Sequence, residues 1–156
     1  MTAPTDTRPR RDWLRWASLA LAAAGALDTI YLTWIKLAHA RAAFCALGGG
    51  CDIVNSSAYS EIGGIPLALF GFGMYGVLLA VLALEDRLEL LREYGRLAVF
   101  GLALTGTLYS AYLTYLELYV IHAVCPYCVV SAVVVTILLV LAIVRLVQPN
   151  PVDEAG

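Results

Sequence analysis

The chain has 156 residues, of which 61% are apolar or aromatic and 14% are charged. A soluble domain contains about 25% charged residues, so this chain is too poor in polar side chains to cover one. Its 12 acidic and 10 basic residues give a net charge of −2, which provides no basic surface for nucleic acid. Composition and charge therefore exclude a soluble enzyme, a disordered tail and a nucleic-acid-binding module, and indicate an integral membrane protein.

Four apolar stretches are each about as long as the 20 residues that cross a bilayer as a helix. The chain is predicted to be an all-α membrane protein, a single domain of residues 1–156 folded as a four-transmembrane-helix bundle. The predicted helices span about residues 16–37, 65–84, 97–119 and 126–147. We expect an outer cap loop over residues 38–64 between the first two helices, and disordered tails over residues 1–11 and 149–156.

Basic residues are distributed unevenly about these helices. One side carries Arg8, Arg10, Arg11, Arg15, Arg87, Arg92, Arg96 and Arg145, and the other carries Lys36 and Arg41. Because cytoplasmic loops are rich in Lys and Arg, we expect both termini in the cytoplasm. A cleaved signal peptide is the alternative for the N-terminus, but the apolar residues continue to Ile35, which is too long for such a segment.

The four cysteines all fall on the predicted outer side. Cys45 and Cys51 lie in the cap loop, and Cys125 and Cys128 lie where the fourth helix begins. This placement is typical of disulfide chemistry in an oxidising compartment. Two alternatives are structural disulfides that staple the loops and a metal site of four cysteines, and the five residues between Cys45 and Cys51 argue against the metal site.

The sequence Cys125-Pro126-Tyr127-Cys128 is a CxxC motif at a helix N-terminus. Its spacing permits a reversible disulfide. The free N–H groups and positive dipole of the helix end favour the thiolate, which is the attacking species in disulfide exchange. The motif therefore predicts redox chemistry at the outer boundary of the membrane.

An internal repeat relates the first and third predicted helices. Residues 27–37 and 108–118 align at a constant offset of 81, with five identical positions, and each copy precedes a cysteine. Parallel repeats that each deliver a cysteine to the outer face are one interpretation, and chance similarity between apolar sequences is the other. The alignment pairs Lys36 with Glu117, which suggests an ion pair between them.

Asp28 lies well inside the first predicted helix. A carboxylate within a membrane is costly and is a candidate functional group for that reason. The alternative is that it is protonated, or that it is hydrogen-bonded to Thr29, Ser110 or a neighbouring tyrosine.

The order of these features resembles the vitamin K epoxide reductase family in its bacterial form. The shared features are four helices, a cysteine pair in the first loop and a CxxC that opens the fourth helix. Residues 51–59 are similar to the family's loop, with a serine six residues after Cys51, and Gly64-Ile65-Pro66 followed by Phe70-Gly71 and Tyr75 is similar to the start of its second helix. The resemblance covers roughly residues 15–146.

The resemblance implies an up-and-down bundle around a quinone, with Cys125 and Cys128 as the active-site pair and Cys45 and Cys51 as the shuttle pair. Ser57 would lie near the quinone and the cap. The quinone is expected to be menaquinone, ubiquinone or a vitamin K type. The resemblance also implies a bacterial cytoplasmic (inner) membrane and a thioredoxin-like or DsbA-like extracytoplasmic partner, which we expect to be a separate protein because the sequence stops at Gly156.

A lipid-soluble ring needs an apolar, aromatic-lined pocket. The expected wall residues are Phe70, Phe72, Tyr75, Tyr112 and Tyr115. The sequence departs from the animal family members, since Ala132 and Leu67 stand where those have a tyrosine and an asparagine. This departure argues against epoxide reduction and leaves plain quinone reduction unaffected.

The expected function is that of a membrane thiol:quinone oxidoreductase. It would regenerate disulfides in its partner and pass two electrons to the membrane quinone pool. The Gly48-Gly49-Gly50 run is expected to give the cap loop the mobility that shuttling needs. One alternative is a DsbB-type disulfide generator, although the CxxC of that type lies in the first outer loop. The other is a non-enzymatic membrane scaffold stapled by disulfides.

Overall fold

A computed structural model describes residues 8–38 and 50–148. Four long helices dominate these residues, and each is long and apolar enough to cross a membrane. They are α1 (Arg8–Leu37), α3 (Leu67–Leu84), α4 (Glu89–Leu116) and α5 (Pro126–Val147). The predicted fold class, an all-α membrane protein with four transmembrane helices, is therefore confirmed.

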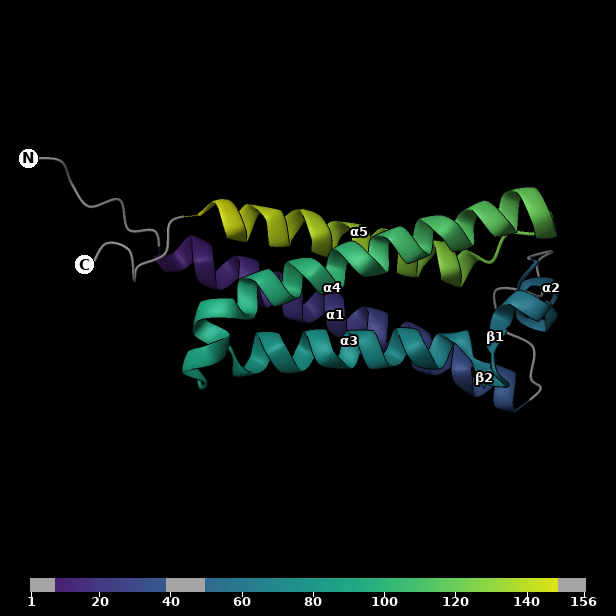
Figure 1. Cartoon of the computed structure of the whole chain (residues 1–156), viewed down its shortest axis with the longest axis horizontal. Helices are drawn as coiled ribbons and strands as arrows, with labels where there is room; N and C mark the ends of the chain where they lie inside the picture. The colour runs from purple at the N-terminus through teal and green to yellow at the C-terminus, as the bar shows by residue number, and fades with distance from the viewer. Residues whose placement is uncertain (1–7, 39–49, 149–156) are drawn as a thin grey trace, which may run out of the picture.

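The helices form a bundle in which each packs against two others. α1 contacts α3 and α5, and α4 contacts the same two helices from the opposite side. α1 and α4 run in one direction along the bundle and α3 and α5 run in the other (Figure 1). The two helices that carry the repeated sequence are thus parallel and diagonal to one another.

The helix ends differ from the prediction at three points. α1 begins at Arg8, so residues 8–11 are helical and do not belong to a disordered tail. α3 begins at Leu67, because Ile65 and Pro66 form a short strand instead. α4 begins at Glu89, eight residues before the predicted start, since six of residues 89–96 are Glu, Leu or Arg, which are good helix formers despite the charge.

The centre of the bundle is packed around Tyr75, which is fully buried with Leu78 and Leu82 of the same helix. Small residues let the other helices approach it closely. A Cβ atom on Gly25 would lie 2.4 Å from the Tyr75 ring, so only glycine permits this contact between α1 and α3. Large apolar side chains such as Leu27, Leu97 and Leu108 are exposed around the outside, as expected for a surface that faces lipid.

The bundle end opposite the cysteines is held by buried charges. Arg145 on α5 donates to Glu85 across 2.6 Å, and the two side chains are only 6% and 9% exposed. Arg96 on α4 donates to the backbone carbonyls of Arg145 and Gln148 at 3.2 Å. This network joins α3, α4 and α5 near one membrane boundary.

We expect Glu85→Gln to lower the free energy of unfolding by about 3–5 kcal/mol, because the variant leaves the Arg145 guanidinium buried without its counter-charge. Unfolding in detergent measures the effect. Asp86→Asn is the matched control: its carboxylate pairs with Arg15 but its side chain is 67% exposed, so we expect a loss within about 1 kcal/mol. Equal losses in the two variants would contradict this account of the buried pair.

A small cap (residues 50–66) lies over the other end of the bundle. It contains α2 (Cys51–Ser56), the 3₁₀ turn η2 (Ala58–Ser60) and the strands β1 (Glu61–Ile62) and β2 (Ile65–Pro66). The two strands pair antiparallel through a two-residue turn in which Gly63 and Gly64 both have positive φ, the conformation that a tight hairpin requires. The cap returns the chain from the end of α1 to the start of α3.

Candidate active site

The CxxC motif forms the start of α5. Cys125 is the N-cap residue, with extended φ and ψ of −95° and 113°, and Pro126 occupies the first turn, where its missing N–H costs nothing. Cys128 lies within that first turn. Both cysteines are free thiols; Cys125 is buried and Cys128 is half-buried. The helix therefore holds two thiols close together at its positive end.

The Cys125 thiol has a lowered pKa. The largest cause is a side-chain hydrogen bond from the Cys128 thiol, and the backbone N–H groups of Cys128 and Tyr127 act in the same direction. Burial and the negative charge of Glu117 oppose them and raise the pKa of Cys125, but they do not reverse the shift. Cys125 is accordingly the thiol of the reduced pair that ionises first.

Replacing Cys128 by alanine removes that hydrogen bond, so we expect the pKa of Cys125 to rise toward or above its ordinary range. The measurement is the ultraviolet thiolate absorbance against pH in a background in which Cys45 and Cys51 are serine. Val130→Ala, a substitution at an exposed position of the same helix, should leave the pKa of Cys125 unchanged. An unaltered Cys125 titration in Cys128→Ala would show that the neighbouring thiol is not the cause.

Glu117 lies directly against this pair. α4 ends in a π-helical turn, η3 (Glu117–Ile121), and His122 then adopts a left-handed conformation with φ of 56°. This irregular reversal brings the chain back, so that the backbone N–H of Cys125 donates to Glu117 Oε2 at 3.1 Å. The Glu117 side chain is only 4% exposed and also accepts a hydrogen bond from the Cys128 thiol.

Cys51 begins α2 and is also buried beside the CxxC. Together with Ile35 and Cys125 it forms one buried cluster, against which Cys128 and Tyr127 pack. Cys51 is disulfide-bonded, while Cys45 lies outside the described residues. The cap thus places a disulfide sulfur next to the reduced pair.

Contacts made by Lys36 and by Gly50 hold the cap in this position. Lys36 Nζ at the end of α1 donates to the carbonyl of Asn55 at 2.8 Å and pairs with Glu61 at 3.0 Å. Gly50 lies on the chain just before the CxxC: a Cβ atom there would be 2.5 Å from the Cβ and 3.0 Å from the Cα of Ala123. The expected ion pair between Lys36 and Glu117 is therefore wrong, because Lys36 is engaged by the cap and Glu117 by the cysteines.

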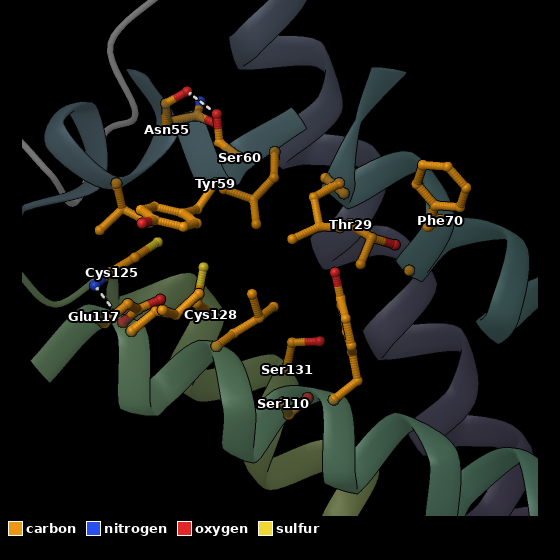
Figure 2. Close-up of a pocket in the computed structure, with 18 of the residues that line it drawn as sticks. Thr29, Asn55, Tyr59, Ser60, Phe70, Ser110, Glu117, Cys125, Cys128 and Ser131 are labelled. Atoms are coloured by element: carbon orange, nitrogen blue, oxygen red, sulfur yellow. Dashed lines mark hydrogen bonds between the residues drawn. The ribbon is translucent and has the colours of Figure 1, made fainter. Parts of the chain in front are cut away.

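A cavity of about 350 Å³ opens below the cap and reaches between the helices. Cys125 and Cys128 lie at one end of it and Phe70 at the other, with Ser110 and Ser131 between them (Figure 2). Its wall is largely apolar, and its volume falls in the range of small-molecule sites. Cys51 lines it as well, so the described cysteines meet at one cavity.

The two copies of the sequence repeat form facing parts of this cavity wall. Thr29, Leu32 and Ile35 of α1 line it, and so do the equivalent Ser110, Leu113 and Leu116 of α4. The repeat therefore corresponds to a structural relation between two parallel helices on either side of the cavity.

Of the expected wall residues, Ser57, Phe70 and Tyr75 line the cavity. Tyr112 and Tyr115 do not: they project from another face of α4 and are 53% and 56% exposed, so the expectation that they line the pocket is corrected. Phe72 also lies elsewhere, in a shallow groove between α1 and α3. The α4 tyrosine in the wall is Tyr109, one helical turn before Leu113.

Several polar residues of the wall were not expected at the cavity. They are Asn55, Tyr59, Tyr109, Ser110 and Ser131. The hydroxyl of Tyr75 lies 3.1 Å from both the hydroxyl and the carbonyl oxygen of Ser131, and so connects α3 to α5 inside the cavity. The signal for Glu117, an acidic residue within an apolar stretch, was present in the sequence but was assigned to the wrong partner.

Asp28 does not line this cavity. Thr29 donates to the carbonyls of Gly25 and Ala26, not to Asp28, and no donor among the described residues reaches Asp28 Oδ2. The expected hydrogen bond to Thr29 is therefore absent from the described part of the chain.

Fold and site together define a multi-pass membrane protein with a dithiol at the mouth of an apolar cavity. The model of the vitamin K epoxide reductase family matches residues 16–143, and the chain belongs to this family. Thiol-disulfide oxidoreductase LTO1 of Arabidopsis thaliana is 41% identical over 95 residues, which are 58% of this chain and 25% of that protein. The chain thus spans about a quarter of the length of this relative. The family that the sequence resembles is confirmed.

Proposed function

We propose that this protein is a membrane thiol:quinone oxidoreductase that oxidises an extracytoplasmic thioredoxin-like protein. One observation carries the proposal: the free thiols of Cys125 and Cys128 open onto an apolar cavity, beside a disulfide-bonded Cys51. A site of this kind can pass electrons from thiols outside the membrane to a lipid-soluble acceptor within it. The name of the plant relative, a thiol-disulfide oxidoreductase, supports the first half of this activity.

The proposed electron path follows the cysteines. A thiolate of the partner attacks the disulfide that Cys51 makes with Cys45, and Cys51 is released. Cys51 then attacks Cys125 of the oxidised CxxC, with which it shares a buried cluster, and Cys128 is released toward the cavity. The partner's second thiolate then breaks its own link to Cys45, and Cys45 attacks Cys51, which frees Cys125 and re-forms the Cys45–Cys51 disulfide. The partner is left with a disulfide, and it is the source of the two electrons that now reside on the CxxC pair.

The cavity suits a quinone as the electron-accepting substrate. Its apolar wall fits a lipid-soluble ring, and the phenol of Tyr109, the amide of Asn55 and the hydroxyl of Ser110 supply hydrogen bonds for ring carbonyls. Ser57 lines the cavity but donates its own proton to the Val54 carbonyl at 2.7 Å, so it is left as an acceptor. Leu67 adds an apolar contact where animal members have an asparagine, which favours reduction of a plain quinone such as menaquinone, ubiquinone or a vitamin K type.

We place the protein in a bacterial cytoplasmic membrane, with both termini in the cytoplasm and the cysteines outside. Arg15, Arg96 and Arg145 lie at the bundle end away from the cysteines, which supports this orientation. At the end with the cysteines, the described residues include one lysine, Lys36, and no arginine. A DsbB-type enzyme is not proposed, because the chain belongs to a different family.

The experiment is steady-state turnover of purified protein in detergent, with a reduced thioredoxin-like protein and a soluble quinone. We expect quinone absorbance to fall only when both substrates and the protein are present. A variant with all four cysteines replaced by serine is the control and should be inactive. Failure of several quinones to react, with every wild-type cysteine remaining in a disulfide, would instead support a non-enzymatic scaffold.

A further inference from the structure

We propose that Glu117 is a catalytic residue that takes the proton of the Cys128 thiol and delivers it to the quinone. This inference rests on the proposed function and assigns a proton path to it. Glu117 hydrogen-bonds to the reacting Cys128 thiol and to the Cys125 backbone, and it lines the same cavity as both cysteines.

The surroundings of Glu117 leave it without an ordinary structural role as an ion-pair partner. Its side chain is 4% exposed, and no lysine, arginine or histidine lines the cavity within the described residues. Lys36, the basic residue at the end of α1 beside the cap, is bound to Asn55 and Glu61. Burying a carboxylate within a membrane without a counter-charge costs free energy, which indicates that the charge of Glu117 has a functional role.

The ionisable groups that share the cavity come from α2, η2, α3, α4, η3 and the start of α5, whereas the described residues of α1 contribute none. Besides Glu117, Cys51, Cys125 and Cys128, they are Asp52 on α2, Tyr59 on η2, Tyr75 on α3 and Tyr109 on α4. Asp52 is exposed to solvent, and Tyr75 is engaged with Ser131. Glu117 is the carboxylate of this set that hydrogen-bonds to a thiol of the CxxC.

The backbone around Glu117 is also unusual. Single π turns often mark functional sites, and a left-handed residue that is not glycine is uncommon. Here both occur in succession, at Glu117–Ile121 and at His122, and they turn the carboxylate back over Cys125, eight residues further on. If α4 continued as a regular helix through this segment, the chain would not turn back and the Glu117 carboxylate would not reach the CxxC.

When Cys125 is the thiolate, the reduced pair holds one proton, on Cys128. Glu117 takes this proton as the bond between the two sulfur atoms forms, and two electrons pass to the quinone. Glu117 then gives the proton to one quinone oxygen, and water supplies the second proton. The products are the Cys125–Cys128 disulfide, a hydroquinone and the original Glu117 carboxylate.

The test is the single-turnover rate of quinone reduction by the reduced protein over a range of pH. Glu117→Gln can still accept the Cys125 N–H but cannot carry a proton, so we expect it to be about 100-fold slower at pH 7. Its rate should rise about tenfold per pH unit as hydroxide replaces the missing base, and approach the flatter wild-type profile. A Gln variant within threefold of wild type, or one slowed equally at every pH, would overturn the proposal.

Two further variants keep the test decisive. Glu117→Asp retains a carboxylate and is expected to keep the flat profile at a lower rate. An Asp profile that rises about tenfold per pH unit would overturn the proposal, whether or not the Gln variant folds. Glu89→Gln, at the exposed start of the same helix, is the control and should behave as wild type. If wild type and this control fail to reduce any quinone, the proposed function itself is wrong, and the role of Glu117 falls with it.

Discussion

Cys128→Ser is expected to abolish quinone reduction, with a loss on the order of 10³-fold or more. Serine has nearly the same shape, but it cannot form the disulfide with Cys125 that releases two electrons to the cavity. The measurement is quinone absorbance with reduced thioredoxin-like protein as donor. Val129→Ser, at the next position of α5 and outside the cavity wall, is the matched control and should retain activity.

The same variant should also trap an intermediate. Cys51 and Cys125 share a buried cluster, and without Cys128 a disulfide between them has no resolving thiol on the inner side. Peptide mapping of the non-reduced protein is expected to identify a Cys51–Cys125 link. Full activity in Cys128→Ser would contradict the assigned path, and a trapped link from Cys125 to Cys45 in place of Cys51 would contradict its order.

The second large effect is expected at Gly50. Its φ of −71° is open to any residue, so the chain does not need glycine there for its conformation. It needs glycine because the cap lies on the backbone of Ala123 at this point. Gly50→Val should lift Cys51 away from Cys125, and misplacement by about 1 Å can slow a reaction about 100-fold.

Two electron donors separate this effect from general damage. We expect partner-driven turnover of Gly50→Val to fall about 10- to 100-fold, while quinone reduction driven by dithiothreitol, which reduces the CxxC directly, stays near the wild-type rate. Gly73→Val is the control, because a Cβ atom at Gly73 meets nothing within 4 Å. Equal loss with both donors would show that the substitution disturbs the whole fold and not the transfer step.

The helices and the placement of the cysteines could be predicted because both depend on local sequence. Long apolar stretches have few alternatives in a membrane, and the CxxC directly precedes the last of them. The repeat was also informative, since equivalent residues such as Thr29 and Ser110 line the same cavity. These features could be predicted because they depend little on how the helices rotate against one another.

The cavity wall was less predictable, because the face that a helix turns inward is decided by packing. On α4, Tyr109 and Leu113 are one turn apart and face the cavity, whereas Tyr112 and Tyr115 lie on another side. Ser110, Thr114 and Glu117 recur at helical spacing and line the cavity, so the sequence does contain a short polar stripe on the inner face, but the expectation was built on the aromatic residues instead. The aromatic residues alone could not distinguish lipid from cavity.

The surroundings of Glu117 could not be predicted for a different reason. A regular helix places Glu117 at the same depth as Lys36 of the repeat, which is why the sequence suggested an ion pair. The π turn and the left-handed His122 change the local course of the chain, and the cap draws Lys36 toward Asn55. Neither irregularity has a sequence signature at this site.

An anaerobic titration of fully reduced wild-type protein with a soluble quinone tests directly whether this cavity couples thiol oxidation to quinone reduction. Quinone absorbance and the number of free thiols are followed together. We expect two thiols to be lost for each quinone reduced, and the first disulfide to form should join Cys125 and Cys128. Quinone that stays oxidised while every thiol stays free would contradict the claim that this cavity couples thiol oxidation to quinone reduction.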